Sequence, residues 1–402
     1  MKAIEDEVYI ISIARTPIGK FGGIFSHVEA PTLASYAIRA AIERAGLTPN
    51  DIQAYVMGQA IQGGVGQHSA RRAALLAGIP EHVNGFVVNM VCSSGMVAIW
   101  EAYKMIKMEE YDIVVAGGME SMSRAPLALP PEARWGMKHL VTREAKIIDL
   151  MVFDGLTDSW NWKLMGVEAD EIAWENNVPR EELDEIAYRS HIRAIKATEE
   201  KIFQDEIVPV EVEIPKRGRI VVEEDEGIRR DTNIEKLQKL PPVFTPKGPH
   251  TAGNSSQLSD GASALVLASG RIVEEIGLEP LARIAGFAWV GLKPEKFVYG
   301  AIEAAKKLLR KLGWSTRDVD LWEVNEAFAI NIWLFQKVFP EVSIEHVNPF
   351  GGAIALGHPL GCTGARIVVT LINALRRHGL RRGIATLCHG TGGGTALAIE
   401  VV

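Results

Sequence analysis

Short apolar runs and longer stretches of helical periodicity alternate along the first part of the chain. Val8 to Ala14 (VYIISIA) is rich in β-branched residues and predicts a buried strand. From Thr32 onward apolar residues recur at helical spacing until Gly46, which suits a left-handed helix cap, so we expect a helix that starts at Thr32. Further strands are expected at 51–57, 86–88 and 113–116, the last ending at Gly117-Gly118, with a helix after Ser93. This rhythm predicts an α/β layer fold.

The pattern is then repeated. Residues 41–60 align without a gap on 308–327, with Gly46 opposite Gly313 and Asp51 opposite Asp318. This indicates a duplicated domain of roughly 120 residues, the alternative being chance similarity between two helix-turn-strand units. Between the copies, 168–203 has helical periodicity, 207–222 alternates as a hairpin would, and 262–268 predicts a strand that returns to the first domain. We therefore expect an N-terminal domain of 1–120 plus 251–275, an inserted loop domain of 121–250, and a C-terminal domain of 276–402.

Composition restricts the classes of partner. The chain has 402 residues, of which 47% are apolar and 23% charged, enough for two or three domains. Its formal charge of -7 offers no basic field for nucleic acid or an anionic membrane, and no window approaches 18 uninterrupted apolar residues. Three cysteines without CxxC spacing favour a reducing compartment, so we expect a cytoplasmic protein.

Four segments carry candidate reactive side chains. Cys92 follows a strand at the start of a helical pattern, where the helix dipole would lower its pKa; the alternative is an inert buried thiol. His358, in a glycine-rich loop, suits proton transfer or donation to an oxyanion, or is simply a turn residue. Cys388 stands at a strand end beside Gly390, and its alternative is a core thiol. Asn325 ends a strand of the second copy, where ligand sites of α/β folds collect, unless it is a helix cap.

Together these segments resemble the thiolase family, over essentially the whole chain. Cys92-Ser93-Ser94-Gly95 is similar to the family's nucleophile motif, and 325–329 (NEAFA) to its asparagine motif. Residues 351–366 are similar to its histidine motif, and Cys388 with Gly390 to its second-cysteine motif. The resemblance implies a duplicated thiolase-like fold of five layers, α/β/α/β/α, with an inserted loop domain. It also implies an acetyl-CoA C-acyltransferase.

The family's reaction is a ping-pong Claisen condensation and its reverse, thiolysis. By this resemblance, Cys92 attacks an acyl thioester while His358 takes its proton, and Cys388 moves the substrate α-proton. His358 and a water held by Asn325 would stabilise the enolate oxygen, and the backbone N–H groups of Cys92 and Gly390 the tetrahedral oxyanion.

Coenzyme A thioesters are the substrates that the resemblance implies, namely acyl-CoA, acetyl-CoA and CoA, with no metal and no other cofactor. The residues expected to contact CoA or the acyl group are Ser256, Met165, Phe244, Leu164, Ala252 and Phe328. Phosphate contacts could come from Lys216, Arg217, Arg219, Arg229 and Arg230, although Glu223 to Glu226 interrupt this run and favour a solvated hairpin instead. A homodimer or homotetramer is expected, the latter through 121–145.

Departures from the family pattern leave the acyl chain open. Leu164 stands where many short-chain biosynthetic thiolases have His, Tyr299 where Met is common, and Phe350, His389 and Thr391 also depart from the usual residues. A biosynthetic acetoacetyl-CoA thiolase is thus an alternative. A decarboxylating ketoacyl synthase would lack Cys388, a protein that only binds acyl-CoA or lipid would lose a reactive residue, and a metal site from both cysteines and His358 lacks short ligand spacing.

Overall fold

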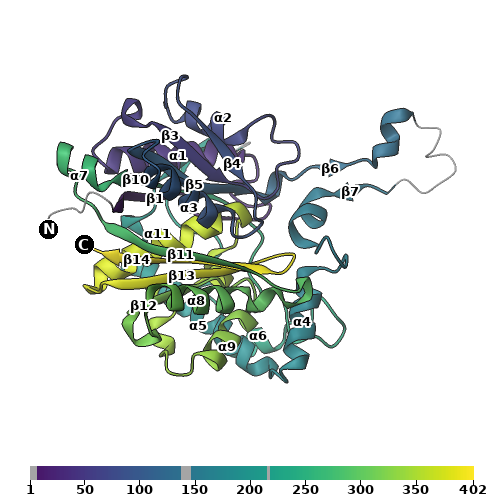
Figure 1. The fold of residues 1–402 in the computed structure, drawn as a ribbon. Helices are drawn as coiled ribbons and strands as arrows, with labels where there is room; N and C mark the ends of the chain where they lie inside the picture. The colour runs from purple at the N-terminus through teal and green to yellow at the C-terminus, as the bar shows by residue number, and fades with distance from the viewer. Residues whose placement is uncertain (1–6, 137–145, 215–217) are drawn as a thin grey trace.

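The computed structural model describes residues 7–136, 146–214 and 218–402. Its main sheet follows the order β12-β13-β14-β11-β1-β10-β5-β3-β4, with β2 beside β10 (Figure 1). The two halves of this sheet meet where β1 pairs with β11 over only two residue pairs, Tyr9 with Arg283 and Ile10 with Ala282. The sheet is therefore two similar units with a narrow junction.

The first half contains β1 (Val8–Arg15), β2 (Gly19–Lys20), α1 (Ala30–Arg44), β3 (Ala54–Gly58), α2 (Ser69–Leu76), β4 (Asn84–Val88), α3 (Ser94–Lys107), β5 (Ile113–Ser121), β10 (Ser259–Ser269) and α7 (Gly270–Ile276). The second half contains β11 (Ala282–Gly291), α8 (Gly300–Leu312), β12 (Leu321–Val324), α9 (Ala329–Val338), α10 (Ala353–Leu356), α11 (Leu360–His378), β13 (Arg382–His389) and β14 (Gly393–Val401). Between them lie β6 (Leu127–Ala128), β7 (Ile148–Asp149), α4 (Met165–Glu175), α5 (Arg180–Glu199), β8 (Val210–Ile214), β9 (Gly218–Val222) and α6 (Ile234–Gln238).

Three apolar cores correspond to the five predicted layers. One lies between α1, α2 and the outer face of the first half-sheet, a second around α3 and α11 between the half-sheets, and a third beneath α8 and α9. The central core buries α11 almost entirely from Leu360 to Leu375. This explains the long apolar stretch of that segment, since a helix covered on all sides has no polar face. The five-layer architecture predicted from the sequence is confirmed.

The internal repeat is realised in detail. Gly46 follows α1 with φ 71° and Gly313 follows α8 with φ 68°, both in the left-handed region that favours glycine. Each glycine is followed by a short turn with the same capping box, Thr48 with Asp51 and Ser315 with Asp318. A parallel strand then begins, β3 or β12. The aligned segments thus adopt the same conformation.

Two predicted boundaries were wrong. The helix expected from Thr32 starts at Ala30, because Pro31 occupies its first turn, where a missing N–H costs nothing. The strand expected to end at Gly117-Gly118 continues to Ser121. These glycines do not terminate β5 but allow close packing, since a Cβ at Gly117 would overlap the Ser263 carbonyl oxygen and one at Gly118 that of Gly361.

The inserted segment is fixed to the first half by buried charges. Arg15, fully buried, pairs with Glu206 at 2.6 Å and with Asp225 at 2.7 Å. Glu226 accepts hydrogen bonds from the backbone N–H groups of Lys20 and Ile24. The predicted hairpin is present as β8 and β9, but the acidic run after it is not simply solvated. Asp225 is buried because it neutralises Arg15.

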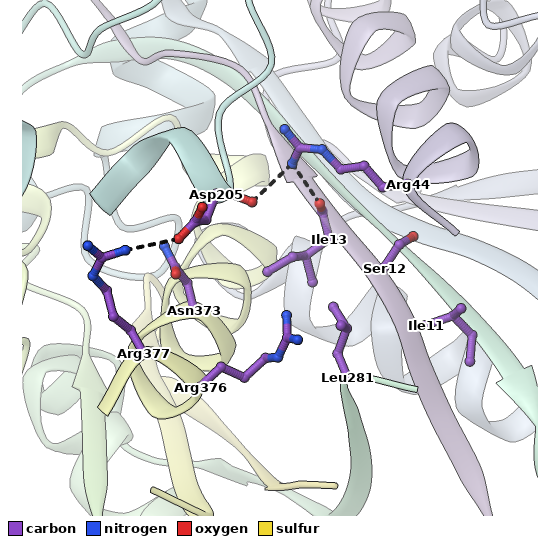
Figure 2. A pocket seen from close by; sticks show the side chains of 9 residues that line it. All are labelled: Ile11, Ser12, Ile13, Arg44, Asp205, Leu281, Asn373, Arg376 and Arg377. Atoms are coloured by element: carbon purple, nitrogen blue, oxygen red, sulfur yellow. Dashed lines mark hydrogen bonds and ion pairs between the residues drawn. The ribbon is translucent and has the colours of Figure 1, made fainter. Parts of the chain in front are cut away.

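A cavity of about 460 Å³ lies between β1 and the end of α11. Figure 2 shows Arg44 reaching across it from α1, where it donates to the carbonyl oxygens of Ile13 and Asp205, while Arg377 pairs with the Asp205 carboxylate. None of the residues expected to do chemistry lines this cavity. Within the described part of the chain, no helix has the length and apolar character needed to cross a membrane.

Candidate active site

The turns that carry Cys92 and His358 are brought together by glycines at the starts of α3 and α11. A Cβ at Gly95 would come within 2.7 Å of the Ala365 N atom, and one at Gly364 within 2.5 Å of the Met96 N atom. The two helices therefore cross with backbones nearly in contact. Cys92 immediately precedes α3 and His358 precedes α11, so this crossing positions both residues.

The Cys92 turn has an unusual backbone. Val91 has φ 47°, a conformation that is rare for a β-branched residue. Ser94 stabilises it, because its hydroxyl donates to the Val91 carbonyl oxygen at 2.6 Å and accepts from the Met90 N–H at 2.8 Å. Such strain persists only where surrounding bonds fix it, and it is typical of functional sites.

The predicted lowering of the Cys92 pKa was wrong. Burial raises the pKa of this thiol above its usual value, and the neighbouring Cys388 and Glu120 raise it further. Backbone hydrogen bonds from Gly390 and from Cys92 itself act in the opposite direction but are outweighed. The resting residue is thus a thiol, and it needs a base to become a nucleophile.

His358 has the tautomer of a base facing the site. Its Nδ1 atom lies 2.6 Å from the Thr363 hydroxyl oxygen, and that hydroxyl donates in turn to the Pro359 carbonyl oxygen. Nδ1 therefore carries the proton, which leaves Nε2 free to accept one. Burial lowers the pKa of His358 to about 3, so the ring is neutral at physiological pH. Thr363 was not identified from the sequence, although it lies within the histidine motif.

Asn325 and Cys388 stand at the same edge of the sheet. β12 and β13 are parallel, with Val324 opposite Thr386, so the strands end together. The Asn325 amide nitrogen lies 3.5 Å from His358 Nε2, and its amide oxygen is buried without a hydrogen-bond partner. The prediction of Asn325 at a strand end is confirmed, and its unpartnered oxygen suits a polar ligand atom.

Cys388 is buried and holds its proton more tightly than an ordinary thiol. Burial raises its pKa to about 12, against a smaller opposing effect of the Asn331 amide, which donates to the sulfur at 3.3 Å. The other end of the Asn331 amide accepts from the Phe328 N–H at 3.0 Å. Sequence reasoning missed Asn331; the signal was a buried amide in an otherwise apolar stretch of α9.

Glu120 is a second residue that the sequence analysis missed. Its carboxylate accepts hydrogen bonds from the N–H groups of Ala60 and Gly361, both at 2.9 Å, and so links the loop after β3 to the first turn of α11. Burial raises its pKa to about 7. No sequence pattern marks this residue, because its partners are backbone groups distant in the chain.

The residues expected to contact the acyl group or CoA are partly assembled around this centre. A Cβ at Gly390 would lie 3.3 Å from the Met165 sulfur, so Met165 borders the catalytic turn. Phe244 covers Gly166 and packs edge-to-face on Phe328 with ring centroids 5.7 Å apart.

The segment before β10 runs beside Phe328. Ser255 forms a β-bridge with it, and the Ser256 N–H donates to the Ala327 carbonyl oxygen at 3.0 Å. Ala252 is exposed on the preceding turn. Leu164, just before α4, is 39% exposed although apolar.

Two residues that departed from the family pattern face elsewhere. The Tyr299 hydroxyl accepts a hydrogen bond from the Asn176 side chain at 2.8 Å, at the end of α4. Phe350 packs against Phe203 and His378, near the end of α11 opposite to His358. Phe350 therefore does not close the acyl site.

Comparison with known proteins places the chain in a family. Residues 8–271 match the model of the thiolase N-terminal domain and residues 278–401 that of the thiolase C-terminal domain. An acetyl-CoA acetyltransferase of Synechocystis is 45% identical over 98% of this chain and 100% of the relative. A probable acetyl-CoA acyltransferase of Staphylococcus aureus is 40% identical over 98% of each chain. The crystal structure of the Bacillus anthracis acetyl-CoA acetyltransferase matches with a TM-score of 0.95 and 41% identity over 100% of both chains. The chain belongs to the thiolase family and is an acyltransferase.

Proposed function

We propose that this chain interconverts 3-ketoacyl-CoA plus CoA with acyl-CoA plus acetyl-CoA through an acyl-cysteine on Cys92. The observation that carries the proposal is the meeting of two thiols and a neutral imidazole at one sheet edge, with a backbone N–H directed at Cys92. Relatives named acetyl-CoA acetyltransferase support it.

In the first half-reaction the Cys92 sulfur attacks the thioester carbonyl while its proton passes to His358 Nε2. A carbon–sulfur bond forms, the carbonyl oxygen becomes an oxyanion, and the N–H groups of Cys92 and Gly390 stabilise it. Collapse expels the leaving group, which takes the proton. The free Nε2 of His358 fits the role of base, because its neutral form persists across the physiological range.

In the second half-reaction Cys388 exchanges a proton with the substrate α-carbon. During thiolysis it protonates the departing enolate of acetyl-CoA, and during condensation its thiolate removes that proton. A thiol whose pKa is raised to about 12 is protonated at rest, which suits the donor role. The enolate oxygen is held at Asn325 and His358, where the unpartnered Asn325 amide oxygen positions the water that completes this site.

The acyl side is apolar, and we propose that it accepts chains longer than four carbons. Leu164 presents an exposed aliphatic side chain where a histidine would add a polar group. Phe153 and Trp162 lie beyond it, with ring centroids 5.4 Å apart. Each buried methylene contributes about 0.8 kcal/mol, so longer chains gain affinity on such a surface. The named acetyl-CoA acetyltransferases favour a second candidate, a biosynthetic enzyme restricted to acetoacetyl-CoA.

The phosphates of CoA are assigned to Arg229. Arg219 is paired with Glu211 and Arg230 with Glu224, whereas Arg229 is exposed and forms no ion pair among the described residues. Gln257 connects this region to the centre, since it binds the nearby Gly227 carbonyl and its own carbonyl accepts the His358 N–H. Lys216 and Arg217 lie outside the described residues.

The remaining proposals concern organisation. We assign 1–120 plus 251–275 and 276–402 to the two thiolase-like domains, and 121–250 to the inserted loop domain. CoA thioesters are the substrates, with no further cofactor, and the protein is a cytoplasmic homo-oligomer. All three cysteines are free, which fits a reducing compartment.

Thiolysis of acetoacetyl-CoA and 3-ketohexanoyl-CoA by the purified protein tests the proposal. Acetyl-CoA is measured by chromatography with CoA present or omitted. We expect CoA-dependent formation of acetyl-CoA from both substrates. A protein that binds acyl-CoA but forms no acetyl-CoA would contradict the assignment.

A further inference from the structure

His389 occupies the turn between β13 and β14, directly between Cys388 and Gly390. Its Nδ1 atom lies 2.8 Å from the Gly390 carbonyl oxygen. A carbonyl oxygen only accepts hydrogen bonds, so Nδ1 carries the proton and donates it. The half-buried ring therefore bridges its own residue to the next one along the chain.

A matching glycine makes room for this ring. His389 pairs with Gly393 across the two strands, and a Cβ at Gly393 would overlap the His389 imidazole. Gly392 is confined as well, because its carbonyl accepts the Leu292 N–H at 2.8 Å. The imidazole is thus held in a fitted position and is not a free surface side chain.

The turn needs such restraint. Thr391 has φ 63° and Gly392 has φ 76°, and the left-handed region is unfavourable for a β-branched residue such as Thr391. Gly390, before them, has no side chain to limit its two backbone torsions. Strained turns persist where neighbouring bonds over-determine them, and the His389 bond is one of these.

The bond acts on the group that contacts the nucleophile. It closes a ring that runs from the imidazole through the Gly390 carbonyl, both torsions of Gly390 and its amide nitrogen, back to His389. That amide forms a hydrogen bond with Cys92. We infer that His389 is a positioning residue, whose bond to the Gly390 carbonyl holds the Gly390 N–H in line with Cys92 and with the oxyanion formed there. The inference rests on the proposed acyl-cysteine chemistry.

The test compares His389→Ala with His389→Asn, whose side-chain amide can donate to the same carbonyl. The rate constant for acetylation of Cys92 by acetyl-CoA is measured in a single turnover, together with the acetyl-CoA concentration at half-maximal rate. Removing one oxyanion donor typically costs about 100 to 1000-fold, so loss of its alignment should cost about tenfold in the Ala variant. The half-maximal concentration should stay unchanged, and the Asn variant should recover to within about threefold of wild type.

Ser159→Ala is the matched control, since Ser159 contacts Thr391 at 3.5 Å from outside the turn. We expect it to stay within about twofold of wild type. Acetylation of His389→Ala within twofold of wild type would overturn the inference. So would an equal loss in the Ala and Asn variants with lowered thermal stability, since it indicates a merely structural role. Failure of wild-type acetylation would instead overturn the proposed function itself.

Discussion

At the scale of single residues, the two active thiols differ in surroundings and therefore in role. Cys92 contacts backbone N–H groups that can receive a developing oxyanion, whereas Cys388 is bound by the Asn331 side chain. The first environment favours nucleophilic attack, and the second favours proton transfer by a thiol held in place. A sequence shows two cysteines beside glycines, but only the fold separates their tasks.

Replacing Cys388 by Ala should stop proton transfer without stopping acylation. Cys92 should still be acetylated by acetyl-CoA, because neither its base nor its N–H donors are altered. The acetyl α-protons should no longer exchange with deuterated solvent, whereas wild type exchanges them. Mass spectrometry of acetyl-CoA recovered from D₂O measures this, and exchange at the wild-type rate would assign the base to another group.

The pH dependence of acetylation should reflect a buried His358. Its pKa is lowered to about 3 from the usual 6.5, so the neutral base is retained as pH falls through 6.5 and is lost only near pH 3. We expect the rate constant for Cys92 acetylation to stay within about twofold between pH 8 and pH 5.5. A fall with a midpoint near 6.5 would show that the ring titrates as an exposed histidine does.

Leu164 should set the preference for acyl chain length. Two additional methylenes contribute roughly 1.6 kcal/mol, or somewhat over tenfold in kcat/KM if the gain is fully expressed in the transition state. We expect 3-ketohexanoyl-CoA to be cleaved at least as well as acetoacetyl-CoA, and Leu164→His to shift the preference toward acetoacetyl-CoA. The kcat/KM values for four-, six- and eight-carbon substrates decide this. A steep fall after four carbons in wild type would favour the biosynthetic alternative.

At the scale of elements, local pattern sufficed where a segment's partners are close in sequence. The β1 strand, the α3 helix after Ser93 and the repeated helix-glycine-turn-strand unit follow from periodicity and capping residues. Gly117 and Gly118 misled the prediction, because glycine signals a turn locally but here accommodates the backbones of Ser263 and Gly361. Such packing depends on residues far along the chain.

The same limit applies to the site. Cys92, His358, Asn325 and Cys388 were found through motifs, whereas Asn331 was not, since its role depends on the distance between α9 and β13. The Cys92 pKa was misjudged for a similar reason. The helix start is visible in the sequence, but the burial that outweighs it is a property of the folded chain.

At the scale of the whole molecule, the β6–β7 arm extends away from the body (Figure 1). It carries apolar side chains exposed to solvent, among them Leu127, Leu129, Ile147 and Trp135, which is 78% exposed. Residues 137–145 of the predicted assembly segment 121–145 lie outside the described part. Exposed apolar surface of this kind marks interaction sites, and we assign it to contacts between copies of the chain.

Trp135→Asp should therefore weaken assembly, converting a tetramer to dimers, because it places a charge in an apolar contact. Light scattering coupled to gel filtration measures the mass. Trp160→Asp is the control, since Trp160 is similarly exposed but lies outside the arm. An unchanged mass for Trp135→Asp, or a wild-type dimer, would contradict a role of the arm in tetramer formation.

The central claim is that catalysis passes through an acyl group on Cys92. Its most direct test is the intact mass of the wild-type protein after incubation with acetyl-CoA in the absence of a thiol acceptor, followed by peptide mapping. The account predicts one acetyl adduct per chain, located on Cys92, with no adduct and no thiolysis in Cys92→Ala. An adduct on another residue, or an active Cys92→Ala variant, would contradict it.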